Sequence, residues 1–164
     1  MHELGPESNF NESMYINIFD PANQVGGFFR TGNRANEGYA EMTVCLYLPD
    51  GRVGFMFKRP PITSNDALDA GGLTWTIVTP FEELRVDYVG RVVLLDDATQ
   101  MADPKRAFTN NPHVECEAHV TFTGAGRASM FGGEPDTPHE PTGGGVRQGP
   151  LRAARAGPRH TARR

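Results

Sequence analysis

The stretch from Glu37 to Pro60, EGYAEMTVCLYLPDGRVGFMFKRP, constrains the fold more than any other part of the chain. Residues 41–48 alternate, with Met42, Val44, Leu46 and Leu48 on one face and Glu41, Thr43, Cys45 and Tyr47 on the other. This period of two predicts a half-buried strand. Pro49-Asp50-Gly51 then predicts a turn, and a second alternation follows through Val53, Phe55 and Phe57. We therefore expect a β-hairpin with an apolar face that the rest of the chain covers.

The rest of the first 123 residues predicts further short strands. Alternation predicts strands at 14–19, 25–30, 73–78, 84–88 and 114–123, and Gly90 is expected to bend the chain into another strand at 92–95. Residues 31–36 are expected to turn the chain into the central hairpin. The one expected helix covers 99–108 and is kept short by Pro104. The pattern lacks a βαβ alternation, so we predict an all-β, antiparallel open barrel or sandwich.

Charge divides the chain into a body and a tail. Residues 1–145 hold ten basic and twenty acidic residues, a net charge of −10, whereas residues 146–164 hold six arginines and no acid. We expect a β domain over 1–131 and a disordered Gly/Pro/Arg-rich tail over 132–164. A body this acidic is expected to bind no nucleic acid.

A second interpretation of the tail, which we prefer, is a frameshift. Residues 146–164 have no period, but GC-rich codons for 145–157 read one base later can encode a peptide that alternates like a strand. Under this hypothesis the chain is a truncated product, and resequencing the gene beyond the codon for Pro141 tests it.

Several classes of function have no support in the motifs. The chain has no glycine-rich phosphate loop between a strand and a helix, no G-x-S-x-G and no paired cysteines at zinc spacing, so we expect no cofactor and no metal. We also expect no signal peptide and no membrane span. Cys45 and Cys116 fall in predicted strands. A disulfide between them is possible, but reduced thiols in a cytoplasmic protein are favoured.

Two polar clusters are candidates for chemistry. His113, Glu115, Glu117 and His119 share one strand face, where a solvated surface is favoured over a metal site. The other cluster is Glu12, Tyr15, Asn17, Arg30 and Glu41. If these residues point into a barrel, burial would raise the pKa of a glutamate there and suit it to acid–base catalysis. The alternative, that they bond one another or face water, is favoured.

Aromatic residues are frequent, at Phe19, Phe28, Phe29, Phe55, Phe57, Trp75, Phe81 and Tyr88. An ordinary core is the favoured interpretation and an apolar ligand cavity the alternative. In the cavity interpretation, Phe55, Phe57 and Trp75 contact the ligand together with Tyr15, Asn17 and Arg30.

The segments ESNFNESMYINIFD, GGFFRTGNRANEGYAEMTVCLYLPDGR, DAGGLTW, MADPKRAFTNNP and MFGGEP resemble a group of uncharacterised actinobacterial proteins. That group is similar, more distantly, to the AttH-like and hydroxyneurosporene synthase (carotenoid hydratase) families. The resemblance covers residues 6–145 and implies two consecutive lipocalin-like β domains that handle an apolar isoprenoid- or steroid-like molecule. This chain departs from the group after its glycine-rich stretch, so we expect it to be the inactive N-terminal half.

The reaction implied by the resemblance is hydration of a carbon–carbon double bond. Glu41 or Glu12 would then donate the proton, with Tyr15 and Asn17 orienting it. Two other functions remain open, a non-catalytic lipid carrier and a structural β module without a ligand. The size of the cavity separates the module from the other two.

Overall fold

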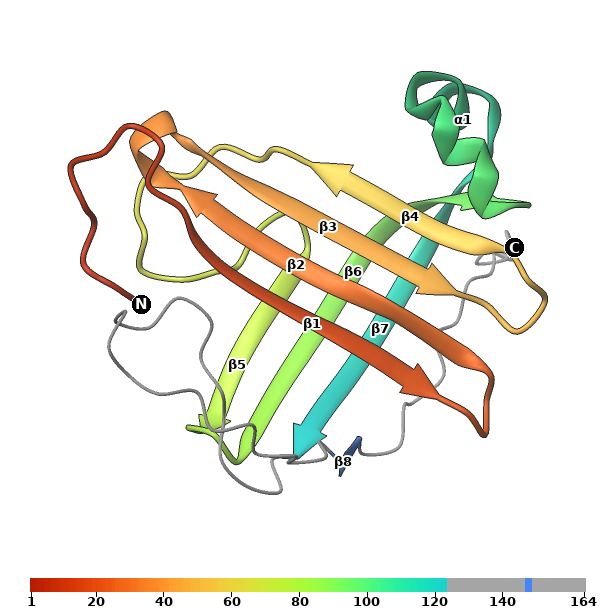
Figure 1. The fold of residues 1–164 in the computed structure, drawn as a ribbon, viewed down its shortest axis with the longest axis horizontal. Coiled ribbons are helices and arrows are strands. Elements are labelled where there is room, and N and C mark those ends of the chain that lie inside the picture. Colours follow the sequence, from red (N-terminus) through yellow and green to blue (C-terminus); the bar gives the residue numbers. More distant parts are fainter. Residues whose placement is uncertain (124–146, 149–164) are drawn as a thin grey trace, which may run out of the picture.

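A computed structural model describes residues 1–123 and 147–148, and these form one curled antiparallel sheet that makes half of a barrel (Figure 1). The strands are β1 (Glu12–Asp20), β2 (Val25–Arg34), β3 (Tyr39–Tyr47), β4 (Val53–Lys58), β5 (Leu73–Thr79), β6 (Glu83–Leu95), β7 (His113–Thr123) and β8 (Arg147–Gln148). Their order is β1-β2-β3-β4-β6-β7-β8, and β5 pairs with β6. The predicted all-β, antiparallel fold with one short α-helix is confirmed.

The core lies between the two halves of the curled sheet. In Figure 1 strands β1–β4 cross in front of β5–β7. Most of the buried apolar side chains belong to the sides of the strands that face this core. They include Ile18, Phe29, Met42, Val44, Leu73, Val86, Tyr88, Val92, Ala118 and Val120. We call the side of β1–β4 that faces this core the inner face and the opposite side the outer face. The alternation predicted for β1, β3, β5 and β7 therefore identifies the residues that face the core.

Polar contacts inside the core connect β2 to β5 and to the loop before it. Trp75 Nε1 donates to Thr31 Oγ1 at 2.9 Å, and both residues face inward. Asn33 Nδ2 donates to the carbonyl oxygen of Ala67 at 2.7 Å and to Asn65 Oδ1 at 3.3 Å. Buried amide and hydroxyl groups need such partners, so these bonds hold the two layers together at this end of the sheet.

The central hairpin forms as predicted, but its two apolar patterns lie on opposite faces. Gly51 N donates to the carbonyl oxygen of Leu48 at 3.0 Å, and this turn pairs Tyr47 with Val53. Residues directly opposite each other share a face, so Cys45 and Phe55 point outward together. Met56 and Gly54, across from Val44 and Leu46, join the core instead. The expectation of one shared apolar face was wrong, because both faces of this hairpin are partly covered.

Two strands are longer than predicted. β2 continues through residues 31–34, which were expected to turn, since Thr31 and Asn33 pair with β3 and find polar partners in the core. β6 runs unbroken through Gly90, and its two segments pair with different strands: residues 83–88 with β5 and residues 93–95 with β4. One long strand thus replaces the two expected.

The expected helix at 99–108 is instead two short helices. A 3-10 helix, η2, spans Ala98–Ala102, and α1 spans Pro104–Asn110. Pro104 has no N–H to donate to the preceding turn, so it begins a new helix rather than continuing one. Asp103 caps that helix by accepting from the Arg106 amide at 3.1 Å. A further 3-10 helix, η1, spans Ala35–Glu37.

Both cysteines are buried and free, as expected. Within residues 1–123 and 147–148, no helix has the length and apolar character needed to cross a membrane. The predicted domain boundary at residue 131 and the predicted disorder of 132–164 lie outside the described residues, apart from the short strand β8, which pairs with Phe122 and Thr123.

Candidate functional site

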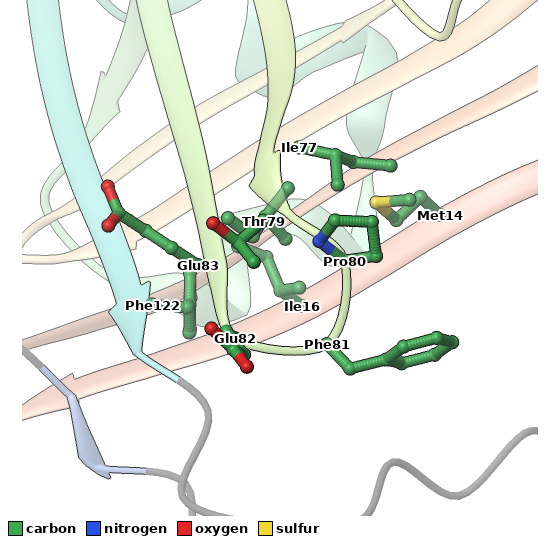
Figure 2. Close-up of a pocket in the computed structure, with 10 residues that line it drawn as sticks. Met14, Ile16, Ile77, Thr79, Pro80, Phe81, Glu82, Glu83 and Phe122 are labelled. Atoms are coloured by element: carbon green, nitrogen blue, oxygen red, sulfur yellow. The ribbon is translucent and has the colours of Figure 1, made fainter.

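An apolar pocket opens between the β1 edge of the half-barrel and the hairpin formed by β5 and β6. Its volume is about 400 Å³. We call it the mouth pocket and define it by its lining residues: Met14, Ile16, Ile77, Thr79, Pro80, Phe81, Glu82, Glu83, Leu84 and Phe122. Figure 2 shows Met14 and Ile16 of β1 near Ile77 and Pro80 of the hairpin. The pocket is therefore built from residues far apart in sequence.

Local sequence explains how the hairpin shapes this pocket. The pairing of β5 with β6 shifts register between Ile77 and Thr79, and Pro80 ends the strand. The amide of Glu82 donates to the carbonyl oxygen of Thr79 at 3.0 Å, which closes the turn. Phe81 sits in that turn at φ 63°, a conformation that non-glycine residues seldom adopt. The turn leaves large apolar side chains uncovered, since Ile77 is 58% and Phe81 70% exposed.

The lining of the mouth pocket is suited to binding and poor in catalytic groups. Among the described residues that line it, the only hydroxyl belongs to Thr79, and none is a histidine, cysteine or lysine. Its two carboxyl groups belong to Glu82 and Glu83, and Arg85 donates to Glu83 from Nε at 2.9 Å and from Nη2 at 2.8 Å. Apolar walls with few polar groups are typical of sites for hydrophobic small molecules.

The polar cluster predicted from the sequence is only partly assembled. Tyr15, Asn17, Arg30 and Glu41 share the outer face, where Tyr15 Oη donates to Asn17 Oδ1 at 2.5 Å. Glu12 lies three residues before Tyr15 in the same strand. Because side chains alternate along a strand, its side chain lies on the inner side of β1. These outer-face residues therefore face away from the barrel interior and from the mouth pocket.

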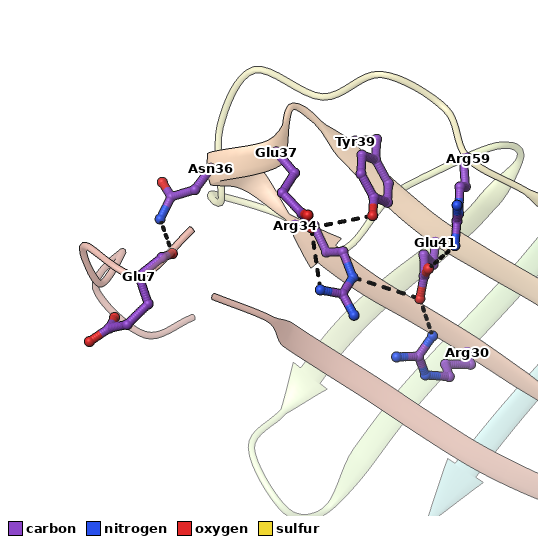
Figure 3. A network of polar contacts seen from close by, with 8 residues as sticks. All are labelled: Glu7, Arg30, Arg34, Asn36, Glu37, Tyr39, Glu41 and Arg59. Atoms are coloured by element: carbon purple, nitrogen blue, oxygen red, sulfur yellow. Dashed lines mark hydrogen bonds and ion pairs between the residues drawn. The ribbon is translucent and has the colours of Figure 1, made fainter. Parts of the chain in front are cut away.

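Glu41 is surrounded by arginines, as Figure 3 shows. Its carboxylate accepts from Arg59 Nη2 at 2.8 Å and from Arg30 Nη1 at 3.4 Å, and Arg34 Nε lies 3.9 Å away. Burial favours a raised pKa, but the bonds from Arg59 and Arg30 and the charge of Arg34 outweigh it, so the pKa of Glu41 is lowered. A raised pKa was expected only if the cluster points into a barrel, and it does not. The alternative, that these residues bond one another, holds for Tyr15 with Asn17 and for Arg30 with Glu41.

Glu12 also has a structural partner. Its carboxylate lies 2.8 Å from His2 Nδ1, and the His2 amide donates to it at 3.1 Å. This arrangement ties the first residues of the chain to the start of β1.

The predicted aromatic ligand contacts divide between the two faces. Trp75 lies on the inner side, where its indole bonds to Thr31. Phe55 and Phe57 lie on the outer face of β4, and the Phe55 ring meets Phe108 of α1 edge-on at 5.9 Å between ring centroids. The sheet thus separates residues that the sequence analysis grouped around one ligand.

The four residues considered as a metal cluster on β7 have no common centre. His119 Nδ1 lies 2.6 Å from Asp87 Oδ1, His113 Nε2 lies 3.0 Å from the carbonyl oxygen of Phe108, and Glu115 lies 3.5 Å from Arg91. Across the described part of the chain, no group of three or more His, Cys, Asp or Glu residues is placed to hold a metal ion.

Sequence reasoning missed most of the mouth pocket. The alternation in β1 places Met14 and Ile16 on one face, but the sequence does not say which distant segment lies across from them. Pro80 and the exposed apolar residues around it were a usable signal, because a turn rich in large apolar side chains is unusual on a protein surface.

Comparison with known proteins adds a family. A family model described as Domain of unknown function (DUF7064) matches residues 1–147. The chain belongs to this family. No curated protein and no solved structure gives a significant match. The DUF7064 match takes in strands β1–β7, and so includes all the described residues that line the mouth pocket.

Proposed function

We propose that this DUF7064 protein binds an apolar, isoprenoid- or steroid-like small molecule in the mouth pocket. The observation that carries the proposal is a pocket of about 400 Å³ whose walls are mostly aliphatic and aromatic. Ligand sites typically have volumes of about 300–1,000 Å³ and apolar walls. The family resemblance noted for residues 6–145 points to the same class of ligand.

Binding without conversion fits the site better than hydration does. A proton donor for a double bond has to be protonated and next to the ligand. Glu41 is held ionised by arginines on the other side of the sheet, and Glu12 is paired with His2. We therefore favour a carrier over a hydratase, and we expect Glu41→Gln to leave ligand affinity unchanged.

The proposal is tested with all-trans-retinol, a fluorescent and uncharged isoprenoid. Trp75 is the single tryptophan of the chain and lies two residues from Ile77. Bound retinol should therefore quench its emission by energy transfer. Ile77→Glu places a charge in the pocket at a residue that is already 58% exposed, so the fold should tolerate it. We expect the retinol dissociation constant to rise about tenfold or more, equivalent to about 1.4 kcal/mol.

Val78→Glu is the matched control. Val78 is the next residue of β5, is not among the residues that line the mouth pocket and is 43% exposed. We expect this variant to bind retinol like the unmodified protein. Absence of any retinol binding, or an equal loss in both variants, would contradict the proposal.

A further inference from the structure

The outer face of β1–β4 differs from a solvated strand surface. Tyr15, Phe19 and Tyr47 are each about half exposed or more, and Phe57 is 39% exposed. The Tyr15 ring lies 5.6 Å from Phe28 between centroids. Aromatic residues gathered on one face mark a surface that binds something.

One part of this face is shaped into a groove. It lies between β4 and the segment formed by η2 and α1, with a volume of about 520 Å³. We call it the outer groove and define it by Phe55, Phe57, Met101, Pro104, Lys105 and Phe108. Because Pro104 breaks the helical segment in two, Met101 and Phe108 project from separate helices onto the same strand. In Figure 1 α1 stands at the end of the sheet where β4 begins.

Two basic residues lie at the outer groove. Of the residues in its lining that the structure describes, Lys105 is the only charged one. At the other end, the Arg59 guanidinium, which is paired with Glu41, lies 5.6 Å from the centre of the Phe57 ring. The nearest acid in sequence to Lys105 is Asp103, whose carboxylate accepts from the Arg106 amide at the start of α1. The groove therefore presents apolar rings next to an ammonium group.

We propose that the outer groove is a second binding site, for an amphipathic carboxylate. Its planar or polyene body lies against Phe55, Phe57 and Phe108, and its carboxylate pairs with the Lys105 ammonium. An unsaturated chain suits the ring-lined walls, and an anionic head suits the one charge among them. This site is independent of the mouth pocket, because Phe55 and Phe57 lie on the outer face and Met14 and Ile16 on the inner face.

The test uses cis-parinaric acid, a fluorescent polyene carboxylate, and its uncharged methyl ester. The background is Ile77→Glu, which weakens binding at the mouth pocket. We expect the acid to bind this variant, and Lys105→Gln added to it to raise the dissociation constant for the acid about five- to tenfold. The ester should bind both proteins equally.

Arg106→Gln is the matched control. It removes one positive charge from the neighbouring residue of α1, which does not line the outer groove. Binding of the acid should be unchanged in this variant, and Phe57→Ser should weaken binding of acid and ester alike. Equal effects of Lys105→Gln and Arg106→Gln, or no binding of the acid to the Ile77→Glu background, would overturn the proposal. Either result leaves the retinol experiment at the mouth pocket unaffected.

Discussion

At the scale of single residues, Glu41 contributes to stability through its arginines. Replacing it with Gln leaves Arg30, Arg34 and Arg59 close together without their shared counter-charge. Since its side chain is only 14% exposed, we expect Glu41→Gln to lower the free energy of unfolding by about 1–3 kcal/mol in urea denaturation near pH 7. Glu83→Gln is the control, because its ion pair with Arg85 is more exposed and should cost less than about 1 kcal/mol.

Glu41 also makes the free energy of unfolding depend on pH. The pKa of Glu41 is lowered in the folded state from its ordinary value of 4.5. Its contribution is therefore present above pH 4.5 and is lost as the pH falls through the lower folded value. The difference in stability between the unmodified protein and Glu41→Gln should shrink below pH 4.5. A difference that stays constant down to pH 3 would contradict this assignment.

Two buried acids predict the opposite dependence at high pH. Burial raises the pKa of Tyr88 to about 12 and that of Cys116 to about 11, and Tyr88 Oη donates to the carbonyl oxygen of Arg91 at 2.7 Å. Because the folded-state pKa values are raised, the contribution of each protonated group to stability is complete below its pKa in the unfolded chain. That pKa is about 10 for the tyrosine and 9 for the thiol. The contribution is then lost as the pH rises through the folded-state values.

The variant Tyr88→Phe separates the two groups. At pH 7 it should cost about 1 kcal/mol, because the Arg91 carbonyl loses its donor. Between pH 9.5 and 11.5 its urea midpoint should fall less steeply than that of the unmodified protein. Parallel decreases would show that Tyr88 does not titrate in the unfolding transition.

The environment of a residue could be predicted when its partners lie close to it in sequence, and not when they lie far away. The alternation identified which residues of β1 and β3 face the core, because that needs only neighbouring positions. The pKa direction of Glu41 was missed, because Arg59 lies eighteen residues away and is brought in by the pairing of β3 with β4. The mouth pocket was missed for the same reason, since β1 and β5 come close together only when the sheet curls.

At the scale of elements, β2 depends on one glycine. Gly27 has φ +148°, and a Cβ placed on it would lie 2.0 Å from the Cys45 carbonyl oxygen in β3. Gly27→Ala should therefore lower the free energy of unfolding by at least about 3 kcal/mol, because backbone has to move. Gly38→Ala is the control that separates the steric clash with the backbone of β3 from the cost of a positive φ angle. Gly38 has φ +78° with open space around it, so about 1–2 kcal/mol is expected. Equal costs in urea denaturation would contradict the close approach.

The central hairpin shows where pattern reading fails for an element. Each strand alternates, and the turn was predicted, yet the apolar sets of β3 and β4 face opposite sides. Interpreting the alternation in this way requires that one face of the hairpin is exposed to solvent. Here α1 covers part of the outer face over Phe55, so apolar residues are stable on both sides.

At the scale of the whole molecule, the sequence predicted the fold class but not the order of the strands. Short alternating strands without βαβ units were enough to predict an antiparallel sheet. The pairing of β4 with β6, and the displacement of β5 to the side, depend on the long strand β6 changing partners along its length. That in turn determines where the half-barrel is open and where the mouth pocket lies.

An open half-barrel has exposed edges, and the β5 edge predicts self-association. Among the described strands β5 pairs only with β6, and Ile77, Val78 and Phe81 are exposed on and beside it. Such an edge offers unpaired backbone groups and apolar side chains to a second chain, and a lysine on the edge opposes that contact.

In sedimentation velocity we expect the mean sedimentation coefficient of the unmodified protein to rise with concentration, and that of Val78→Lys to stay constant. Thr121→Lys adds the same charge at an exposed position of β7, between β6 and β8, and should behave like the unmodified protein. If both lysine variants suppress association equally, net charge rather than the β5 edge controls it.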